Sequence, residues 1–321
     1  MILRPPISAL LPIYNGEPWI ENALQSINKT LRTTDELLVV DDGSSDATVK
    51  ILESASIVPK MKLVKSMHLG LVSALNLGMQ KATNEWIARY DVDDRYESNR
   101  IEILLDNVQS NTVAVFSDYI FMGKSGEYLG RMNSPIFSGA VKLSLFHSQR
   151  TAHPSVIYRK SAVIMVGGYL EEDFPCEDLS LWFRLSEIGN FESRASTLLT
   201  YTLSENTITS KNRKDIRVKA RSVVERYGSD RQITDAATNL AKTLADYDNY
   251  SFSNARRFLH LTDFLHNKCW ELLNYKQKLK IIQFLVLELL NRKTWNSIFN
   301  LFFEKRKRIR YRKGFTNHKH G

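Results

Sequence analysis

The chain has 321 residues, of which 43% are apolar and 25% are charged, and this composition excludes wholesale disorder. The net charge of +9 is uneven: residues 1–230 hold 26 Lys and Arg against 28 Asp and Glu, a balance of −2, whereas residues 231–321 hold 18 against 7, a balance of +11. An acidic partner surface is therefore expected only for the C-terminal part.

Short β-type runs alternate with amphipathic helical runs over the first 120 residues. Alternation at this spacing is typical of βαβ units, and it predicts an α/β fold with a mostly parallel sheet flanked by helices. Ser45 or Asp46 is expected to cap the second helix. The expected strands are 7–13, 36–40, 62–64, 86–90 and 113–119, and the expected helices are 18–31, 46–55, 71–81 and 97–109.

The later sequence divides into a mixed segment and a helical one. Three glycines within 121–131 favour a hairpin or loop, and residues 151–204 mix short strands with a helix that starts near Asp178. From about residue 212 onward the pattern is helical. We therefore expect an α/β domain over 1–230 and a helical, basic region over 231–321.

Acidic residues follow two of the expected strands. Asp41 and Asp42 come directly after one strand, and Asp91 and Asp93 come after another. Ligands of open parallel sheets bind beyond the carboxyl ends of the strands, where both pairs are expected to lie. In an extended segment residues two apart point to the same side, so Asp91 and Asp93 can face one cation together. Mg²⁺ or Mn²⁺, held by these carboxylates and by substrate phosphates, fits this layout.

Each acidic group also has a structural interpretation, which the sequence leaves open. The stretch 41–46 consists largely of residues that favour turns and helix caps. A third acidic pair, Glu177 and Asp178, opens an amphipathic helix, where acids satisfy free N–H groups and the helix dipole. His153, which precedes a proline, is either a fixed loop element or a contact to acceptor or phosphate.

Six segments follow one another in an order that resembles the inverting glycosyltransferases of family 2 with the GT-A fold, in their bacterial polysaccharide-building branch. The similarity covers roughly residues 5–205. The segments are 13–17 (IYNGE), 41–46 (DDGSSD), 70–76 (GLVSALN), 87–94 (IARYDVDD), 153–156 (HPSV) and 177–182 (EDLSLW).

The resemblance implies a nucleotide-sugar donor, specifically a UDP-sugar, and a divalent metal. Asp41 or Asp42 is expected to accept a hydrogen bond from the base, Asp91 to lie near the ribose and metal, and Asp93 to ligate the metal at the diphosphate. His68 stands where the family often has Asn. The further residues expected to bind the nucleotide are Pro12, Tyr14, Asn15, Glu17 and Gly70.

The resemblance also implies the chemistry of transfer. Asp178 matches the general base, which deprotonates an acceptor hydroxyl as it attacks the anomeric carbon. A single displacement inverts the anomeric configuration, and Glu177 then tunes or positions Asp178. The expected acceptor is a saccharide or a lipid-linked saccharide, and the expected process is the biosynthesis of a cell-surface polysaccharide.

The C-terminal region carries aromatic amphipathic helices and a basic cluster, with seven Lys or Arg among residues 305–313. This combination favours an anionic membrane surface as partner. The alternative is a helical cap on the α/β domain followed by a solvated charged tail. No nucleic-acid motif is recognised, so no nucleic-acid partner is expected.

The expected location is the cytoplasm, with peripheral contact at the inner face of the plasma membrane. Residues 1–6 lack the layout of a signal peptide, and the longest apolar run, 281–290, is far shorter than the roughly 20 residues that span a bilayer. Cys176 and Cys269 show no zinc or disulfide spacing, which suits reduced thiols.

Two other functions are compatible with an α/β nucleotide-binding domain. A sugar-nucleotide pyrophosphorylase needs a Gly-rich phosphate loop with an Arg directly after the first strand, and residues 11–20 do not provide one. A non-catalytic subunit of a polysaccharide assembly is expected to have lost an acidic motif, and all three are present here.

Overall fold

A computed structural model describes residues 4–55, 61–135, 138–146, 151–203 and 212–228. The basic region 231–321 lies outside these residues, so its predicted helices and membrane contact stay predictions. Among the described residues, no helix combines the length and the apolar character that a membrane crossing requires.

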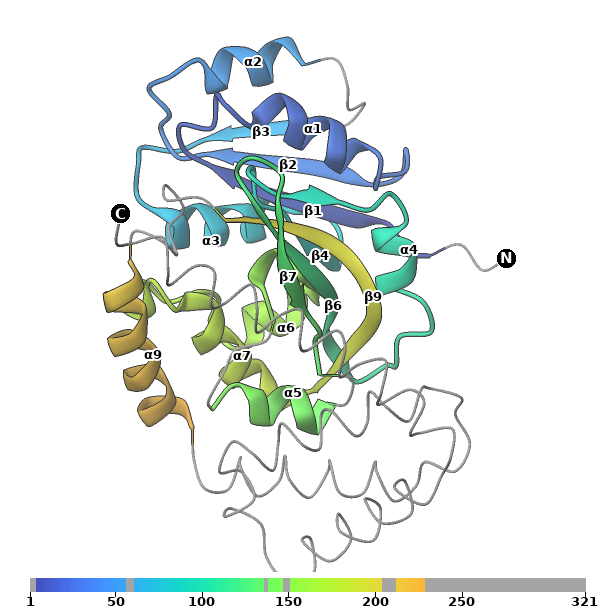
Figure 1. The fold of residues 1–321 in the computed structure, drawn as a ribbon, viewed down its shortest axis with the longest axis vertical. Coiled ribbons are helices and arrows are strands. Elements are labelled where there is room, and N and C mark those ends of the chain that lie inside the picture. The colour runs from blue at the N-terminus through green and yellow to red at the C-terminus, as the bar shows by residue number, and fades with distance from the viewer. Residues whose placement is uncertain (1–3, 56–60, 136–137, 147–150, 204–211, 229–321) are drawn as a thin grey trace, which may run out of the picture.

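One mixed sheet of nine strands forms the centre of the described part (Figure 1). Its order is β3-β2-β1-β4-β8-β6-β9-β5, with β7 paired to β6. The first four strands are parallel, β8 runs antiparallel between β4 and β6, and β6 is parallel to β9. The strands are β1 Ile7–Ile13, β2 Glu36–Asp41, β3 Met61–Lys65, β4 Trp86–Arg89, β5 Arg95–Tyr96, β6 Thr112–Gly123, β7 Tyr128–Met132, β8 Ile157–Arg159 and β9 Asn190–Leu203.

Helices cover both faces of this sheet, as the sequence predicts. One buried apolar cluster joins the sheet to α1, α2 and α4, and a second joins its other face to α3, α5, α6, α7 and α9. The α-helices are α1 Ile20–Asn28, α2 Thr48–Ser54, α3 Leu71–Lys81, α4 Arg100–Leu104, α5 Ser138–Ser144, α6 Lys160–Met165, α7 Glu177–Ile188 and α9 Arg213–Tyr227; short 3₁₀ helices are η1 His153–Ser155 and η2 Glu171–Asp173.

The observed helices differ from the predicted ones mainly at their ends. The prediction of 71–81 is confirmed without change, whereas the prediction of 97–109 is wrong in length, because α4 covers only Arg100–Leu104. Asn107 there adopts a left-handed conformation (φ 48°), which a helix cannot include. Helix α2 begins at Thr48, later than expected, yet the Asp46 carboxylate still accepts a hydrogen bond from the Thr48 N–H at 3.0 Å.

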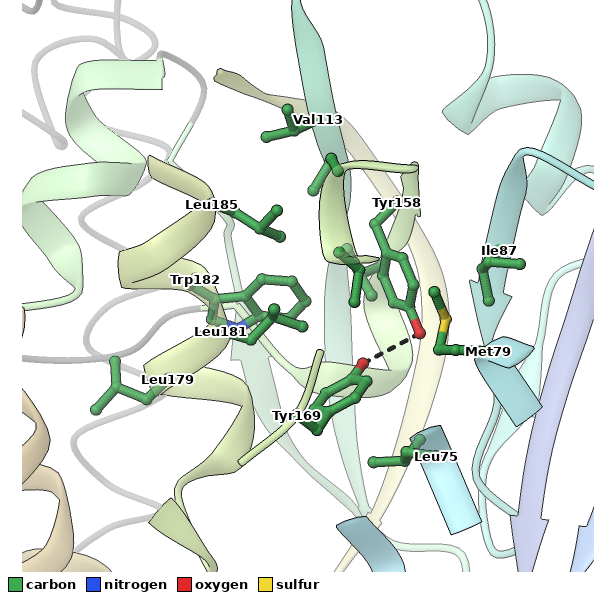
Figure 2. Packing of buried hydrophobic residues seen from close by; sticks show 14 of the residues in the cluster. Leu75, Met79, Ile87, Val113, Tyr158, Tyr169, Leu179, Leu181, Trp182 and Leu185 are labelled. Carbon is green, nitrogen blue, oxygen red and sulfur yellow. Dashed lines mark hydrogen bonds between the residues drawn. The ribbon is translucent and has the colours of Figure 1, made fainter. Parts of the chain in front are cut away.

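Trp182 of α7 packs in the core between the sheet and this helix (Figure 2). Its side chain is fully buried, and its ring meets Phe116 of β6 edge-on at 5.2 Å. Beside it, the Tyr169 hydroxyl donates a hydrogen bond to the Tyr158 hydroxyl at 3.1 Å. Trp182 therefore fixes α7 against the sheet.

A buried ion pair ties the start of β1 to the turn before β2. Arg4 donates two hydrogen bonds to the carboxylate of Asp35, at 2.9 and 2.7 Å. The same carboxylate accepts hydrogen bonds from the N–H groups of Ile7 (2.9 Å) and Arg32 (2.7 Å). These hydrogen bonds hold the pKa of Asp35 below its ordinary value, although burial alone would raise it.

We predict that Asp35→Asn lowers the free energy of unfolding by about 3 kcal/mol, because the buried Arg4 guanidinium then keeps only its ion pair with Glu102. Urea denaturation monitored by circular dichroism measures this loss. Glu53→Gln is the matched control, since its ion pair with Lys65 is more than half exposed on both sides and contributes little. Equal stability of the two variants would contradict the role assigned to Asp35.

Candidate active site

The carboxyl ends of the four parallel strands form one edge of the sheet. The register places Ile13 of β1 beside Asp41 of β2, and Asp41 beside Lys65 of β3. The segments that leave this edge are 14–17, 42–47, 66–70 and 90–94. Both acidic strand ends expected from the sequence therefore lie at this edge. Pro12 is buried within β1 just below it.

The first two of these segments are bonded to each other through their polar groups. Asn15 accepts a hydrogen bond from the Ser45 N–H through its side-chain oxygen and donates one from its own N–H to the Ser44 hydroxyl, both at 2.8 Å. The Glu17 carboxylate accepts from the Ala47 N–H at 3.0 Å. Asn15 and Glu17 thus determine the shape of this part of the edge.

Asp42 organises the segment 66–70. One carboxylate oxygen accepts hydrogen bonds from the Leu69 N–H at 2.8 Å and the Ser66 hydroxyl at 3.0 Å, and the other accepts from the Gly70 N–H at 2.8 Å. Gly70 has φ 94°, a conformation that glycine adopts without strain. The neighbouring Asp41 accepts from the Ser44 N–H at 3.2 Å, and its Oδ1 has no partner among the described residues.

An exposed aromatic pair stands at the same edge. The rings of Tyr14 and His68 are stacked, with centroids 4.1 Å apart and an interplanar angle of 29°. Tyr14 is 47% exposed, and the His68 side chain is also largely exposed. His68 is held by a 3.1 Å hydrogen bond between its Nδ1 and the Asp42 carbonyl. The pair therefore presents a flat aromatic surface that the Asp42-bonded segment keeps in place.

The acidic segment after β4 is crowded with negative charge. Burial, and next to it the charge of Asp91, raise the pKa of Asp93 to about 6. Asp94 is buried; one of its oxygens accepts a hydrogen bond from the Thr202 N–H at 2.8 Å, and its pKa is also raised, first by burial. Asp94 thus anchors β9, while Asp91 and Asp93 remain the carboxylates suited to bind a ligand.

These carboxylates fit a cation that also receives ligand oxygens. Among the described residues, no three acidic, histidine or cysteine side chains are grouped as a complete metal site. Asp91 already pairs with Arg89, because their Oδ1 and Nη2 atoms lie 2.8 Å apart. Mg²⁺ is commonly held by one or two carboxylates together with substrate phosphates, so a protein-only cluster is not required.

The second acidic group lies at the start of α7. Glu177 is only 6% exposed, its Oε2 has no hydrogen-bond partner within the described ranges, and burial together with Asp178 raises its pKa to about 8. Asp178 is more exposed, and its Oδ1 accepts a hydrogen bond from the Leu179 N–H at 2.7 Å. Adjacent acids in one helical turn thus have different surroundings.

The two acidic groups act on each other. The charge of Arg89 lowers the pKa of both Asp93 and Glu177, and the charge of Asp91 raises both. Asp91 and Glu177 therefore lie near enough for their charges to interact, although they are far apart in the sequence.

His153 is a fixed core element. It is 8% exposed, and its Nε2 lies 2.8 Å from the Tyr169 hydroxyl, in hydrogen-bond contact. Burial lowers its pKa well below the ordinary value, so the ring is neutral at pH 7. Of the two interpretations that the sequence leaves open, the structure supports the fixed element.

The sequence interpretation missed two arginines, Arg89 and Arg100, which are both fully buried. Arg100 donates hydrogen bonds to the carbonyls of Arg89 (3.0 Å), Pro154 (2.8 Å) and Val156 (3.1 Å). For Arg89, the sequence offered a signal, because it is the one charged residue in the otherwise apolar run that forms β4. A charge in such a run is buried and paired, which suggests a functional neighbourhood.

Comparison with known proteins identifies related sequences. The family model "Glycosyl transferase family 2" matches residues 8–165. The amylovoran biosynthesis glycosyltransferase AmsE of Erwinia amylovora is 29% identical over 193 residues, which are 57% of this chain and 70% of AmsE. A UDP-Gal:alpha-D-GlcNAc-diphosphoundecaprenol beta-1,3-galactosyltransferase of Escherichia coli is 29% identical over 187 residues, 56% of this chain and 67% of that protein.

Other relatives are much longer than the chain. An uncharacterised glycosyltransferase of Rickettsia conorii is 33% identical over 203 residues, which are 59% of this chain and 32% of the relative. The matched segment thus spans about a third of the length of such relatives.

Solved structures share the fold. A crystal structure of S. aureus TarS 1-349 in complex with UDP-GlcNAc has a TM-score of 0.58 at 17% identity and covers 96% of this chain and 92% of TarS 1-349. The mannosyltransferase PcManGT of Pyrobaculum calidifontis, in complex with GDP-Man and Mn²⁺, has a TM-score of 0.52 at 15% identity, with coverages of 91% and 89%. The α/β domain therefore has the GT-A fold, as the sequence predicts.

The raised pKa of Glu177 generates a stability prediction. Because the folded protein ionises Glu177 only near pH 8, whereas an ordinary glutamate ionises near 4.5, the folded state loses stability relative to the unfolded state as the pH rises between these values. Glu177→Gln removes this loss. We compare the free energy of unfolding of Glu177→Gln with that of the unsubstituted protein. The difference in favour of the variant should grow by roughly 2–4 kcal/mol between pH 5 and pH 8 and level off above pH 8.

Urea denaturation at several pH values measures the difference. Glu171→Gln, on the exposed turn η2, controls for the loss of one nearby carboxylate. A difference that stays flat or shrinks with rising pH would refute the burial assigned to Glu177.

Proposed function

We propose that the chain is a glycosyl transferase of family 2, whose family model matches residues 8–165, and that it transfers a sugar from a UDP-sugar to a saccharide or lipid-linked saccharide, with inversion, in the biosynthesis of a cell-surface polysaccharide. One observation carries the proposal. Asp41 ends β2 and Asp91 follows β4, which are the parallel strands on either side of β1, so both lie at one edge of the sheet, and the charge of Asp91 also raises the pKa of the buried Glu177 at the start of α7. A donor side and an acceptor side can therefore meet there.

On the donor side, the nucleotide binds along the edge formed by the segments after β1, β2 and β3. The stacked rings of Tyr14 and His68 give the base a planar surface. Asp41 accepts a hydrogen bond from the base, because its Oδ1 lacks a partner among the described residues, whereas both oxygens of Asp42 already bind the segment 66–70. Asn15, Glu17 and Gly70 contribute by shaping these segments.

A UDP-sugar is supported by two of the similar proteins. The E. coli galactosyltransferase carries UDP-Gal in its name, and the TarS structure contains UDP-GlcNAc. The PcManGT structure contains GDP-Man, so the identity of the base in the donor of this chain is to be tested directly.

Asp93 and Asp91 would hold the metal together with the donor diphosphate. Burial and the neighbouring charge of Asp91 raise the pKa of Asp93, and a divalent cation would offset this cost. When bound, Mg²⁺ or Mn²⁺ supplies positive charge that stabilises the leaving nucleoside diphosphate. Asp91 keeps its contact with Arg89, which leaves Asp93 as the main protein ligand.

On the acceptor side, Asp178 takes the proton of the attacking hydroxyl. It is more exposed than Glu177, so an acceptor can reach it. Glu177 holds its proton at neutral pH because burial and the charge of Asp178 raise its pKa to about 8. Deprotonation occurs as the oxygen attacks the anomeric carbon opposite the leaving group, which inverts the configuration.

A lipid-linked acceptor is supported by the E. coli relative, whose name specifies a diphosphoundecaprenol-linked sugar, and by AmsE, which is named for amylovoran biosynthesis. A cytoplasmic enzyme that meets such an acceptor at the inner membrane surface suits the basic cluster 305–313. Sedimentation of the full chain with anionic vesicles tests this part separately.

The first experiment screens nucleotide sugars for metal-dependent release of nucleoside diphosphate in the presence of candidate saccharide acceptors. Release of UDP coupled to the appearance of an inverted glycosidic linkage, assigned by NMR, supports the proposal. Formation of UTP from a UDP-hexose and pyrophosphate would instead identify a pyrophosphorylase. No turnover with any donor would favour a non-catalytic subunit.

We predict that Asp178→Asn lowers kcat about 10²–10⁴-fold and leaves UDP affinity within a factor of two, because the amide cannot accept the hydroxyl proton. Steady-state kinetics and calorimetric titration with UDP measure the two effects. Asp215→Asn is the matched control, since Asp215 is an exposed acid in the first turn of another helix, α9. Full transfer activity in Asp178→Asn would overturn the assignment of the base.

We predict that Asp93→Ala abolishes the stimulation of turnover by Mg²⁺ or Mn²⁺ and lowers kcat/KM at least 100-fold, because the cation loses its main protein ligand. Metal titrations of activity measure this effect. Asp106→Ala removes an exposed carboxylate beyond α4 and should retain the wild-type metal response. An unchanged metal response in Asp93→Ala would place the cation elsewhere.

A further inference from the structure

Arg89 is a buried cation at the centre of the proposed site. It is the last residue of β4, and its side chain is only 2% exposed. A guanidinium buried to this extent is costly unless carboxylates or other acceptors surround it. The position of Arg89 therefore requires a compensating interaction within the fold.

The direct partners of Arg89 lie on the donor side. Its Nη2 is 2.8 Å from the Asp91 carboxylate, and its Nη1 donates a hydrogen bond to the Tyr90 carbonyl. The Asp91 N–H is in turn bonded to the Tyr96 hydroxyl at 2.6 Å. Both the backbone and the side chain of Asp91 are thus fixed before any donor binds.

The charge of Arg89 also acts on the acceptor side. Burial raises the pKa of Glu177 at the start of α7 to about 8, and the charge of Arg89 acts in the opposite direction. Beside the larger effect of burial, the charge of Arg89 also lowers the pKa of the His153 ring and of the Tyr169 hydroxyl. Arg89 therefore acts on the end of β4 and the start of α7 alike.

We propose that Arg89 is a positioning residue: its buried guanidinium fixes the Asp91 carboxylate at the end of β4 for the donor. The inference rests on the proposed transferase function and deepens it. Without Arg89, the Asp91 carboxylate faces a diphosphate uncompensated and is free to rotate. The affinity for the donor and kcat then both fall, although Arg89 itself touches no substrate.

The test compares Arg89→Met, which keeps the length of the side chain but removes the charge, with Arg89→Lys, which restores the charge without the planar fork. UDP binding is measured by calorimetry in EDTA, so that no metal contributes, and kcat is measured with the donor identified by the screen. We expect Arg89→Met to weaken UDP binding at least tenfold and to lower kcat at least tenfold. Arg89→Lys should recover most of the UDP affinity and less of kcat.

Arg159→Met is the control. Arg159 belongs to β8 and lies opposite Trp86 at the other end of β4, where it packs over the Trp86 ring and donates a hydrogen bond to the Thr112 carbonyl at 2.8 Å. This variant should lose stability while UDP affinity and kcat of the folded protein stay within a factor of two.

Arg89→Met that folds and keeps wild-type UDP affinity and kcat overturns the inference. If Arg89→Met does not fold, Arg89→Lys decides: a fall in kcat of more than fivefold at an unchanged melting temperature supports positioning, and kcat within a factor of two overturns it. A wild-type protein with neither UDP binding nor turnover would overturn the proposed function itself, which distinguishes the two failures.

Discussion

The site depends on the cost of gathering carboxylates at a partly buried edge. Three of them, Asp93, Asp94 and Glu177, are held where burial and neighbouring acids raise their pKa values. The fold tolerates this arrangement because a guanidinium lies among them and backbone N–H groups hold some of the oxygens. Without a ligand, the repulsion between these carboxylates lowers the stability of the fold. The same repulsion favours the binding of a cation together with a diphosphate, because the cation offsets the negative charge.

The sheet order explains how residues so far apart in the chain meet. The short antiparallel strand β8 lies between β4 and β6, and the chain that follows it passes through α6 to the start of α7. The core around Trp182 and Tyr158 then fixes α7 against one face of the sheet (Figure 2). Arg89 of β4 points to this face, because it lies two residues after Ile87, which belongs to the same core. The acids at the start of α7 are thus positioned by packing, whereas those that follow β4 are positioned by a strand end.

Much of this arrangement could be predicted from the sequence, for identifiable reasons. Parallel strands must end at one edge, so Asp41 and Asp93 could be assigned to that edge from hydrophobic pattern alone. The role of Asp42 could not, because two of the three groups that its carboxylate binds are the backbone N–H groups of residues 69 and 70, which no residue type reveals. The three-residue strand β8 is too short to carry a period, and without it the approach of Glu177 to β4 could not be foreseen.

Burial separates the roles of two adjacent acids. Glu177 and Asp178 are neighbours at the start of one helix, yet one is enclosed beside Arg89 and the other is more exposed. Burial and the charge of Asp178 raise the pKa of Glu177 to about 8, so the buried member of the pair holds its proton at neutral pH. Because a helix turns its successive residues in different directions, a Glu-Asp pair at its first turn places one acid in the core and the other closer to solvent.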